Sequence, residues 1–217
     1  MNDGFVKMWD SWSKKRSSIP VYDLWLDEYK DILQKNKNHE ILDLGCGIGA
    51  DTLYLLERGY NVLSCDFSIE ALKSVSNNIL NSKTLYLDMM KKFPIADNKY
   101  SLIIADLSLH YFNNETTIHI MREIKRILKD GGILLSRVAS INDFNFGAGQ
   151  GEKLENNYYF EGDYTKRFFD LEDVNKYFSI IGNVEAKETQ MTRNEDEYSK
   201  PKKLYEIKVK KKALDNE

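Results

Sequence analysis

The sequence predicts a doubly wound α/β fold: a mostly parallel sheet of seven strands, flanked by helices, with the last strand antiparallel. Short apolar segments alternate with amphipathic ones along residues 39–138, which is typical of parallel strands joined by helical crossovers. Several of the apolar segments have no polar face, so helices must cover both faces of the sheet. The length of 217 residues suits one such domain with a buried core.

The N-terminal segment, residues 1–38, is expected to form a helical cap on this domain. Leu24, Leu26 and Ile32 have the apolar spacing of a helix that leads up to about Gln34. A polar stretch follows and separates this cap from the sheet.

Residues 39–138 are expected to form the core of the sheet. Glu40 to Leu44 has the pattern of a buried strand, and Gly59 ends the helix that comes after it. Ser68 has the side chain of an N-cap for the next helix. Further strands are expected at 60–66, 83–88, 100–105 and 133–138, and a long amphipathic helix at Ile118, Met121, Ile124 and Leu128.

Residues 139–217 are expected to supply a substrate loop and the last strands. The stretch 142–164 shows no clear period, and loops of that length are uncommon unless they have a function. Asp170 can cap a final helix. Strands are then predicted at 180–188 and 203–210, joined by a charged connection.

The composition narrows the function classes. With 31 Lys and Arg against 34 Asp and Glu, the chain lacks the basic excess of a nucleic-acid-binding protein, so we expect no nucleic-acid partner. No apolar run approaches the ~20 residues of a membrane helix, and no signal peptide is apparent; we expect no membrane partner and a cytoplasmic location. Cys46 and Cys65 lack metal-ligand spacing, and no metal site is predicted.

The most informative residues are 43–50, with the sequence DLGCGIGA, where the first strand turns into the first helix. Glycines let the backbone approach a ligand closely, and the helix start offers N–H groups. Gly45, Gly47 and Ala50 also fit the looser dinucleotide pattern, so the glycines leave two cofactors open. Asp43 favours one of them, because its charge opposes a pyrophosphate and suits a cationic amino acid group.

This turn resembles the D-L-G-C-G-x-G signature of class I S-adenosylmethionine-dependent methyltransferases, and later landmarks follow in the same order. The resemblance covers roughly residues 40–138 well and the rest loosely. Within the class, residues 107–112 and 142–169 look most like the small-molecule branch that includes tellurite-resistance and thiopurine-type methyltransferases. It implies a Rossmann-like fold, S-adenosylmethionine as cofactor and methylation of a small-molecule substrate.

The resemblance also implies which residues contact the cofactor. Asp66 corresponds to the ribose-binding acid, Asp88 to an acid at the adenine, and Asp106 lies against the methionine end. The full set is Asp43, Gly45, Cys46, Gly47, Asp66, Phe67, Ser68, Asp88, Met89, Asp106 and Leu107. To these we add Trp9 and Arg16 from the N-terminal segment. Acidic residues at four successive strand ends agree with this, because ligands of open α/β sheets bind at that edge.

Substrate contacts are expected from the segments beyond that edge. His110 is the candidate general base, because an imidazole titrates near neutral pH. Arg137 can hold a substrate acid or, alternatively, form an internal ion pair with Glu155 or Asp143. Tyr111 and Tyr159 are the aromatic candidates for substrate binding. An aromatic lid over the pocket is expected from Tyr158, Tyr159 and Phe160 together with Trp9, Trp12 and Tyr22.

Two other functions stay open from the sequence. One is an NAD(P)-dependent oxidoreductase, which Asp43 disfavours. Its Tyr-x-x-x-Lys match, residues 198–202, is interrupted by Pro201. The other is a cofactor-binding sensor without catalysis. The sequence makes no prediction of oligomeric state.

Overall fold

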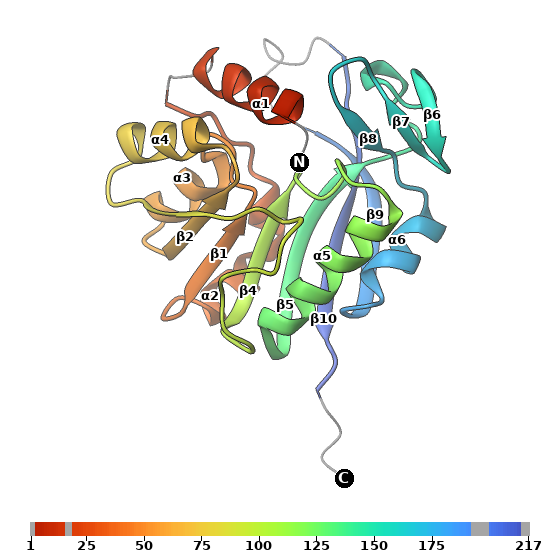
Figure 1. Cartoon of the computed structure of the whole chain (residues 1–217). Helices are drawn as coiled ribbons and strands as arrows, with labels where there is room; N and C mark the ends of the chain where they lie inside the picture. Colours follow the sequence, from red (N-terminus) through yellow and green to blue (C-terminus); the bar gives the residue numbers. More distant parts are fainter. Residues whose placement is uncertain (1–2, 16–18, 192–199, 214–217) are drawn as a thin grey trace.

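The computed structural model describes residues 3–15, 19–191 and 200–213, and within them a seven-stranded sheet lies between layers of helices (Figure 1). Its strand order is β3-β2-β1-β4-β5-β10-β9. The first five strands run parallel, and β10 is antiparallel to both of its neighbours. The predicted fold is therefore confirmed. The strands are β1 (Glu40–Leu44), β2 (Asn61–Asp66), β3 (Lys83–Tyr86), β4 (Tyr100–Asp106), β5 (Leu128–Ala139), β9 (Gly182–Gln190) and β10 (Lys203–Lys211).

Three of the described helices begin after a residue whose side chain accepts from one of their first N–H groups. Ser68 Oγ accepts from the N–H of Ala71 at 3.1 Å, and Asp170 Oδ1 accepts from that of Asp173 at 2.7 Å, so both predicted caps are confirmed. The helical elements are α1 (Asp3–Lys15), η1 (Trp25–Tyr29), α2 (Lys30–Lys35), α3 (Ala50–Glu57), α4 (Ile69–Asn78), α5 (Asn114–Ile127), η2 (Phe144–Phe146) and α6 (Leu171–Phe178).

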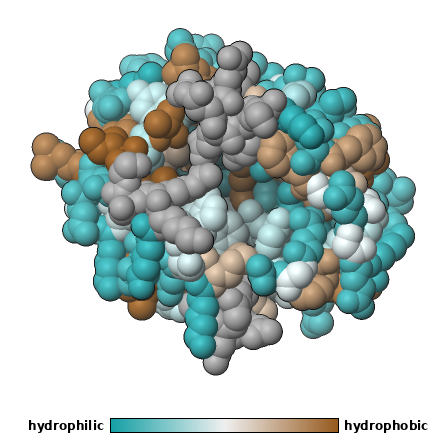
Figure 2. Space-filling view, turned by 90° about the horizontal axis from the view of Figure 1, so that it is seen from above, coloured by the Kyte–Doolittle hydropathy of each residue, from teal (hydrophilic) through white to brown (hydrophobic). Residues whose placement is uncertain are grey.

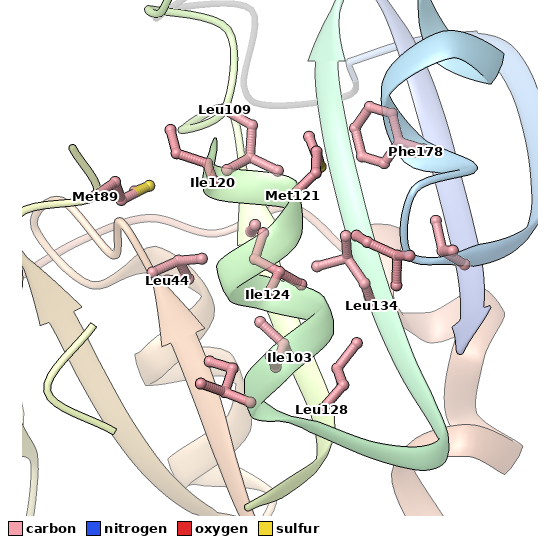
Figure 3. Close-up of a cluster of buried hydrophobic side chains, with 14 of the residues drawn as sticks. Leu44, Met89, Ile103, Leu109, Ile120, Met121, Ile124, Leu128, Leu134 and Phe178 are labelled. Atoms are coloured by element: carbon pink, nitrogen blue, oxygen red, sulfur yellow. The ribbon is translucent and has the colours of Figure 1, made fainter. Parts of the chain in front are cut away.

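Apolar side chains on the two faces of the sheet form two separate cores. On one face, α5 and α6 pack against alternate residues of the central strands (Figure 3). On the other, η1, α2 and α3 pack against the residues in between, such as Ile41 of β1 and Ile104 of β4. Helices on both faces explain why these strands are apolar on both sides.

The stretch 142–164, which the sequence leaves without regular structure, is regular in part. It contains η2 and two strands of a small antiparallel sheet, made of β6 (Glu152–Glu155), β7 (Tyr158–Phe160) and β8 (Thr165–Arg167). The loop expectation was wrong because strands this short show too few residues for a period. The N–H of Arg167 donates to His110 O at 2.7 Å and that of Phe169 to Ala139 O at 2.7 Å, which fixes this sheet beside the carboxyl ends of β4 and β5.

The N-terminal segment departs from its prediction in one respect. The helix expected to lead up to Gln34 is divided into η1 and α2, and Leu24 is 55% exposed, so it does not belong to the apolar face. Upstream, α1 lies across the upper edge of the sheet (Figure 1). No helix in the described ranges has the length and apolar character needed to cross a membrane.

Candidate functional site

A cavity of about 390 Å³ lies at the carboxyl edge of the sheet, under α1. Figure 2 looks down on this side of the molecule and shows a hollow near its centre. The volume is within the range of small-molecule sites. It is lined by Met8, Trp9, Trp12, Ser13, Asp43, Gly45, Cys46, Gly47, Ile48, Ala50, Asp51, Asp66, Phe67, Ser68, Ala71, Met89, Asp106, Leu107, Ser108, Tyr111, Phe112, Tyr164 and Lys202.

The glycine turn between β1 and α3 forms the floor of this cavity. The N–H groups of Gly45 and Cys46 both donate to Cys65 O, at 2.8 and 3.0 Å, which holds the turn against β2. Gly45 has φ +75°, and a Cβ there would lie 2.4 Å from the Cβ of Ser108. Only glycine fits, because the left-handed backbone and the close approach both exclude a side chain.

Asp66 ends β2 beside the turn. Its Oδ2 accepts from the N–H of Gly47 at 2.9 Å and its Oδ1 from that of Ser68 at 2.8 Å. Burial raises the pKa of Asp66, and these backbone hydrogen bonds oppose the rise. A carboxylate oxygen has two lone pairs, so Asp66 can still accept from ligand hydroxyls. Ser68 Oγ donates to Asp10 Oδ1 at 2.6 Å, which fastens α1 over this end of the cavity.

Three further carboxylates line the cavity at β1, α3 and β4. Asp43 is 2% exposed, and Thr52 Oγ1 donates to its Oδ2 at 2.6 Å. Burial, together with the charges of Asp106 and Asp66, raises the pKa of Asp43 to about 7, and the hydrogen bond from Thr52 opposes the rise. Such a cluster of buried acids favours a cationic ligand.

Asp51 is a lining acid that the sequence interpretation missed. Its Oδ1 accepts from Trp25 Nε1 at 3.0 Å, and burial raises its pKa well above the usual value. An acid in the first turn of the helix after a glycine-rich turn is the signal that could have identified it.

Arg137 lies behind this cluster, outside the cavity lining. Its Nε and Nη2 donate to the two carboxylate oxygens of Asp106 at 2.7 and 2.8 Å, and its Nη1 donates to Asp23 Oδ2 at 2.7 Å. The alternative of an internal ion pair is thus the one observed, but both suggested partners, Glu155 and Asp143, were wrong. The guanidinium is 2% exposed and already paired, so the structure gives it no contact with a substrate acid.

His110 contradicts the expectation of a general base. It is 1% exposed, lies outside the cavity lining, and accepts the N–H of Ala139 on Nδ1 at 3.3 Å. Burial lowers the pKa of His110 well below its usual value, and the charges of Lys166 and Lys202 lower it further. The ring is therefore neutral with its proton on Nε2, which leaves no free lone pair to take a proton.

Most of the predicted cofactor contacts meet at the cavity. Those that line it are Trp9, Asp43, Gly45, Cys46, Gly47, Asp66, Phe67, Ser68, Met89, Asp106 and Leu107. Asp88 is not among them, because its carboxylate accepts from the N–H of Met90 at 3.0 Å and pairs with Lys91. Arg16 lies outside the described residues.

The aromatic lid is composed differently from the prediction. Trp9, Trp12 and Tyr111 line the cavity, whereas Tyr159 packs against Phe168 with ring centroids 6.1 Å apart, away from it. The other members expected, Tyr22, Tyr158 and Phe160, do not line it either. The sequence interpretation did not name Phe112, Tyr164 or Lys202 as site residues, although all three line the cavity.

Comparisons with known proteins agree with this geometry. Residues 41–132 match a family described as a methyltransferase domain. The chain is 25% identical over 182 residues to the tRNA N(3)-cytidine methyltransferase METTL2 of Xenopus tropicalis, covering 78% of this chain and 54% of that protein. It is also 24% identical over 173 residues to the glycine/sarcosine N-methyltransferase of Aphanothece halophytica, covering 76% of this chain and 62% of that protein.

The first of these curated relatives are longer proteins, and the chain spans about half of their length, from 42% to 54%. Among solved structures, it resembles a SAM-dependent methyltransferase from Anabaena variabilis with a TM-score of 0.64 and 16% identity, covering 97% of this chain and 96% of that one. This likeness concerns the fold.

Proposed function

We propose that this chain, which belongs to the class I S-adenosylmethionine-dependent methyltransferases, transfers the methyl group of its cofactor to a small molecule held beside it in the cavity. The observation that carries the proposal is the lining of that cavity. Acids gather at the ends of β1, β2 and β4, and aromatic residues with one lysine gather beyond β4.

The residues present fit S-adenosylmethionine. This cofactor has a sulfonium and an ammonium and no phosphate, so the cluster of Asp43, Asp51 and Asp106 suits it, whereas the same cluster offers no cation to the pyrophosphate of NAD(P). Asp66 lies where ribose hydroxyls can donate to it, and the open space over Gly47 allows close backbone contact. The oxidoreductase alternative is therefore not favoured.

The protein's contribution to the reaction is alignment. When bound, the cofactor supplies an electrophilic methyl: an acceptor lone pair bonds to its carbon while the carbon–sulfur bond breaks and leaves its electron pair on sulfur. Orientation of two reactants can supply on the order of 7–11 kcal/mol. With His110 neutral and lacking a free lone pair, we assign no side chain as base; any proton on the acceptor passes to solvent.

A small acceptor is favoured over tRNA, the substrate named for the METTL2 relatives. The cavity lies under α1, whose Trp9 and Trp12 line it, and the chain has a net charge of −3, which opposes a polyanion. Two incubations with labelled cofactor distinguish the two acceptors. One contains small thiols, amines, phenols and acids, and the other contains total tRNA. Label in tRNA alone would overturn the small-molecule acceptor, and binding without any turnover would support the sensor alternative.

Replacement of Asp66 by asparagine should weaken binding of S-adenosylhomocysteine by roughly 10- to 100-fold, because the variant loses charged acceptors for the ribose hydroxyls. Isothermal titration calorimetry measures this effect, with NAD titrated in parallel and expected not to bind. Asp31→Asn, the same change on an exposed residue of α2, is the control and should bind like wild type. Tight binding of NAD, or equal affinity in both variants, would contradict the assignment.

Binding of S-adenosylhomocysteine should also depend on pH. A ligand ammonium pairs with ionised Asp43, whose pKa of about 7 in the free protein leaves it mostly protonated at pH 6. Affinity should therefore rise about tenfold from pH 6 to pH 8 and level off above, since binding favours the deprotonated form. Calorimetry at each pH tests this. Asp43→Asn should bind weakly and without this dependence; a wild-type affinity that falls with pH would refute the pairing.

A further inference from the structure

The cavity is strongly unequal in charge from one end to the other. Asp43, Asp51, Asp66 and Asp106 all line it. Against them stands Lys202, the only lysine or arginine among the described lining residues. A single cation at one end of an otherwise acidic cavity indicates a ligand with a negative group at that end.

The topology places Lys202 well away from the cofactor end. It directly precedes β10, and the pairing of Leu204 with Ala139 puts it at the same edge of the sheet as the carboxyl end of β5. Since β10 is two strands from β4, and strands are about 4.8 Å apart, Lys202 lies roughly 10 Å beyond Asp106 along this edge. A cofactor over β1, β2 and β4 leaves this region for a second molecule.

Aromatic side chains occupy the space between these two ends. Tyr111 and Phe112 follow β4, and Tyr164 precedes β8; all three line the cavity. Tyr111 lies edge-on to Trp9, with ring centroids 5.0 Å apart, and Tyr164 OH donates to Glu161 Oε2 at 2.7 Å. The rings of these three residues suit a ligand with an apolar or aromatic body.

A second donor lies next to this wall. The Nε2–H of His110 is buried and has no hydrogen-bond partner among the described residues, and its ring is 4.4 Å from that of Tyr111. Lys202 Nζ lies 5.2 Å from the centroid of the Phe146 ring, so η2 packs against the Lys202 side chain. Unsatisfied buried donors are uncommon, and this one adjoins the ring of Tyr111, although His110 itself does not line the cavity.

We propose that the Lys202 end of the cavity is the acceptor subsite and that the methyl acceptor is a small carboxylic acid, whose apolar or aromatic body carries the nucleophilic atom on the side of Asp106. Its carboxylate pairs with Lys202, and its body lies between Tyr111, Phe112 and Tyr164. The inference rests on the proposed function, because an acceptor is required only if the cofactor is used for methyl transfer.

Binding of matched acid and amide pairs to the protein saturated with S-adenosylhomocysteine tests the subsite. Benzoate and benzamide, phenylacetate and phenylacetamide, and 4-hydroxybenzoate and its amide are titrated by ligand-observed NMR. At least one acid should bind about tenfold or more tightly than its amide. Lys202→Met should abolish that preference, and Lys202→Arg should keep it. Lys200→Met, which removes an exposed charge two residues away, is the control and should bind like wild type.

The outcomes separate this inference from the function on which it rests. If wild type fails to bind S-adenosylhomocysteine, the proposed function falls and the subsite with it. If that ligand binds but no acid is preferred to its amide, or the preference survives in Lys202→Met, the subsite alone is refuted. If Lys202→Met instead weakens binding of S-adenosylhomocysteine about tenfold, Lys202 serves the cofactor carboxylate and the subsite is likewise refuted.

Discussion

Replacement of Arg137 by methionine should lower the free energy of unfolding by roughly 3–5 kcal/mol. The arginine is the counter-ion of Asp23 and Asp106, whose side chains are 2% and 7% exposed, and its guanidinium lies 4.6 Å from the ring of Trp25. Without it, two carboxylates stay buried without a partner cation. Urea unfolding followed by circular dichroism measures the loss. Affinity for S-adenosylhomocysteine should also fall, because Asp106 lines the cavity and loses the guanidinium that holds its carboxylate in place.

Arg126→Met provides the matched control. Arg126 also pairs with two carboxylates, Glu123 and Asp97, but its side chain is 20% exposed and that of Asp97 is 69% exposed. Water can replace much of what is lost there, so we expect a decrease of about 1–2 kcal/mol. Equal losses of unfolding free energy in the two variants would contradict the prediction. They would mean that Asp23 and Asp106 do not depend on Arg137 as their counter-ion, despite their burial.

The sequence was sufficient for the core of the fold because the signals there are local. Gly59 follows the last turn of α3 with φ +72°, and Ser68 caps α4, as expected from residue type alone. The acids at the ends of parallel strands converge for a topological reason, since those ends share one edge. For this reason, eleven of the cofactor contacts that were predicted from the sequence alone line the cavity.

What could not be predicted depends on contacts between distant segments. Asp23 and Arg137 are 114 residues apart, and nothing in either local sequence marks them as partners. Tyr164 lines the cavity from the connection between β7 and β8, whereas Tyr159 lies in β7 and does not, and the sequence did not reveal these strands. The state of His110 similarly depends on Ala139, which lies 29 residues further along the chain at the end of β5.

Gly45→Ala should have a comparably large effect, through sterics instead of charge. The new Cβ would lie 2.4 Å from Ser108 Cβ and 2.8 Å from Met89 Cε, on a backbone with φ +75°. Met89 can move, but Ser108 is held by the hydrogen bond from its Oγ to Leu44 O at 2.8 Å. Left-handed strain of about 1–2 kcal/mol and overpacking of about 1–3 kcal/mol together predict a loss of roughly 2–5 kcal/mol of stability.

Gly131→Ala separates the two contributions, because Gly131 has φ +72° but no atom within 4 Å of the position of a Cβ. It should lose only the strain, about 1–2 kcal/mol, and keep its affinity for S-adenosylhomocysteine. Gly45→Ala should bind that ligand at least tenfold more weakly, since the turn and the loop at Ser108 both line the cavity and one of them must move. If the two variants matched in stability and in affinity, close packing of the glycine turn against the β4 loop would not be what shapes the site.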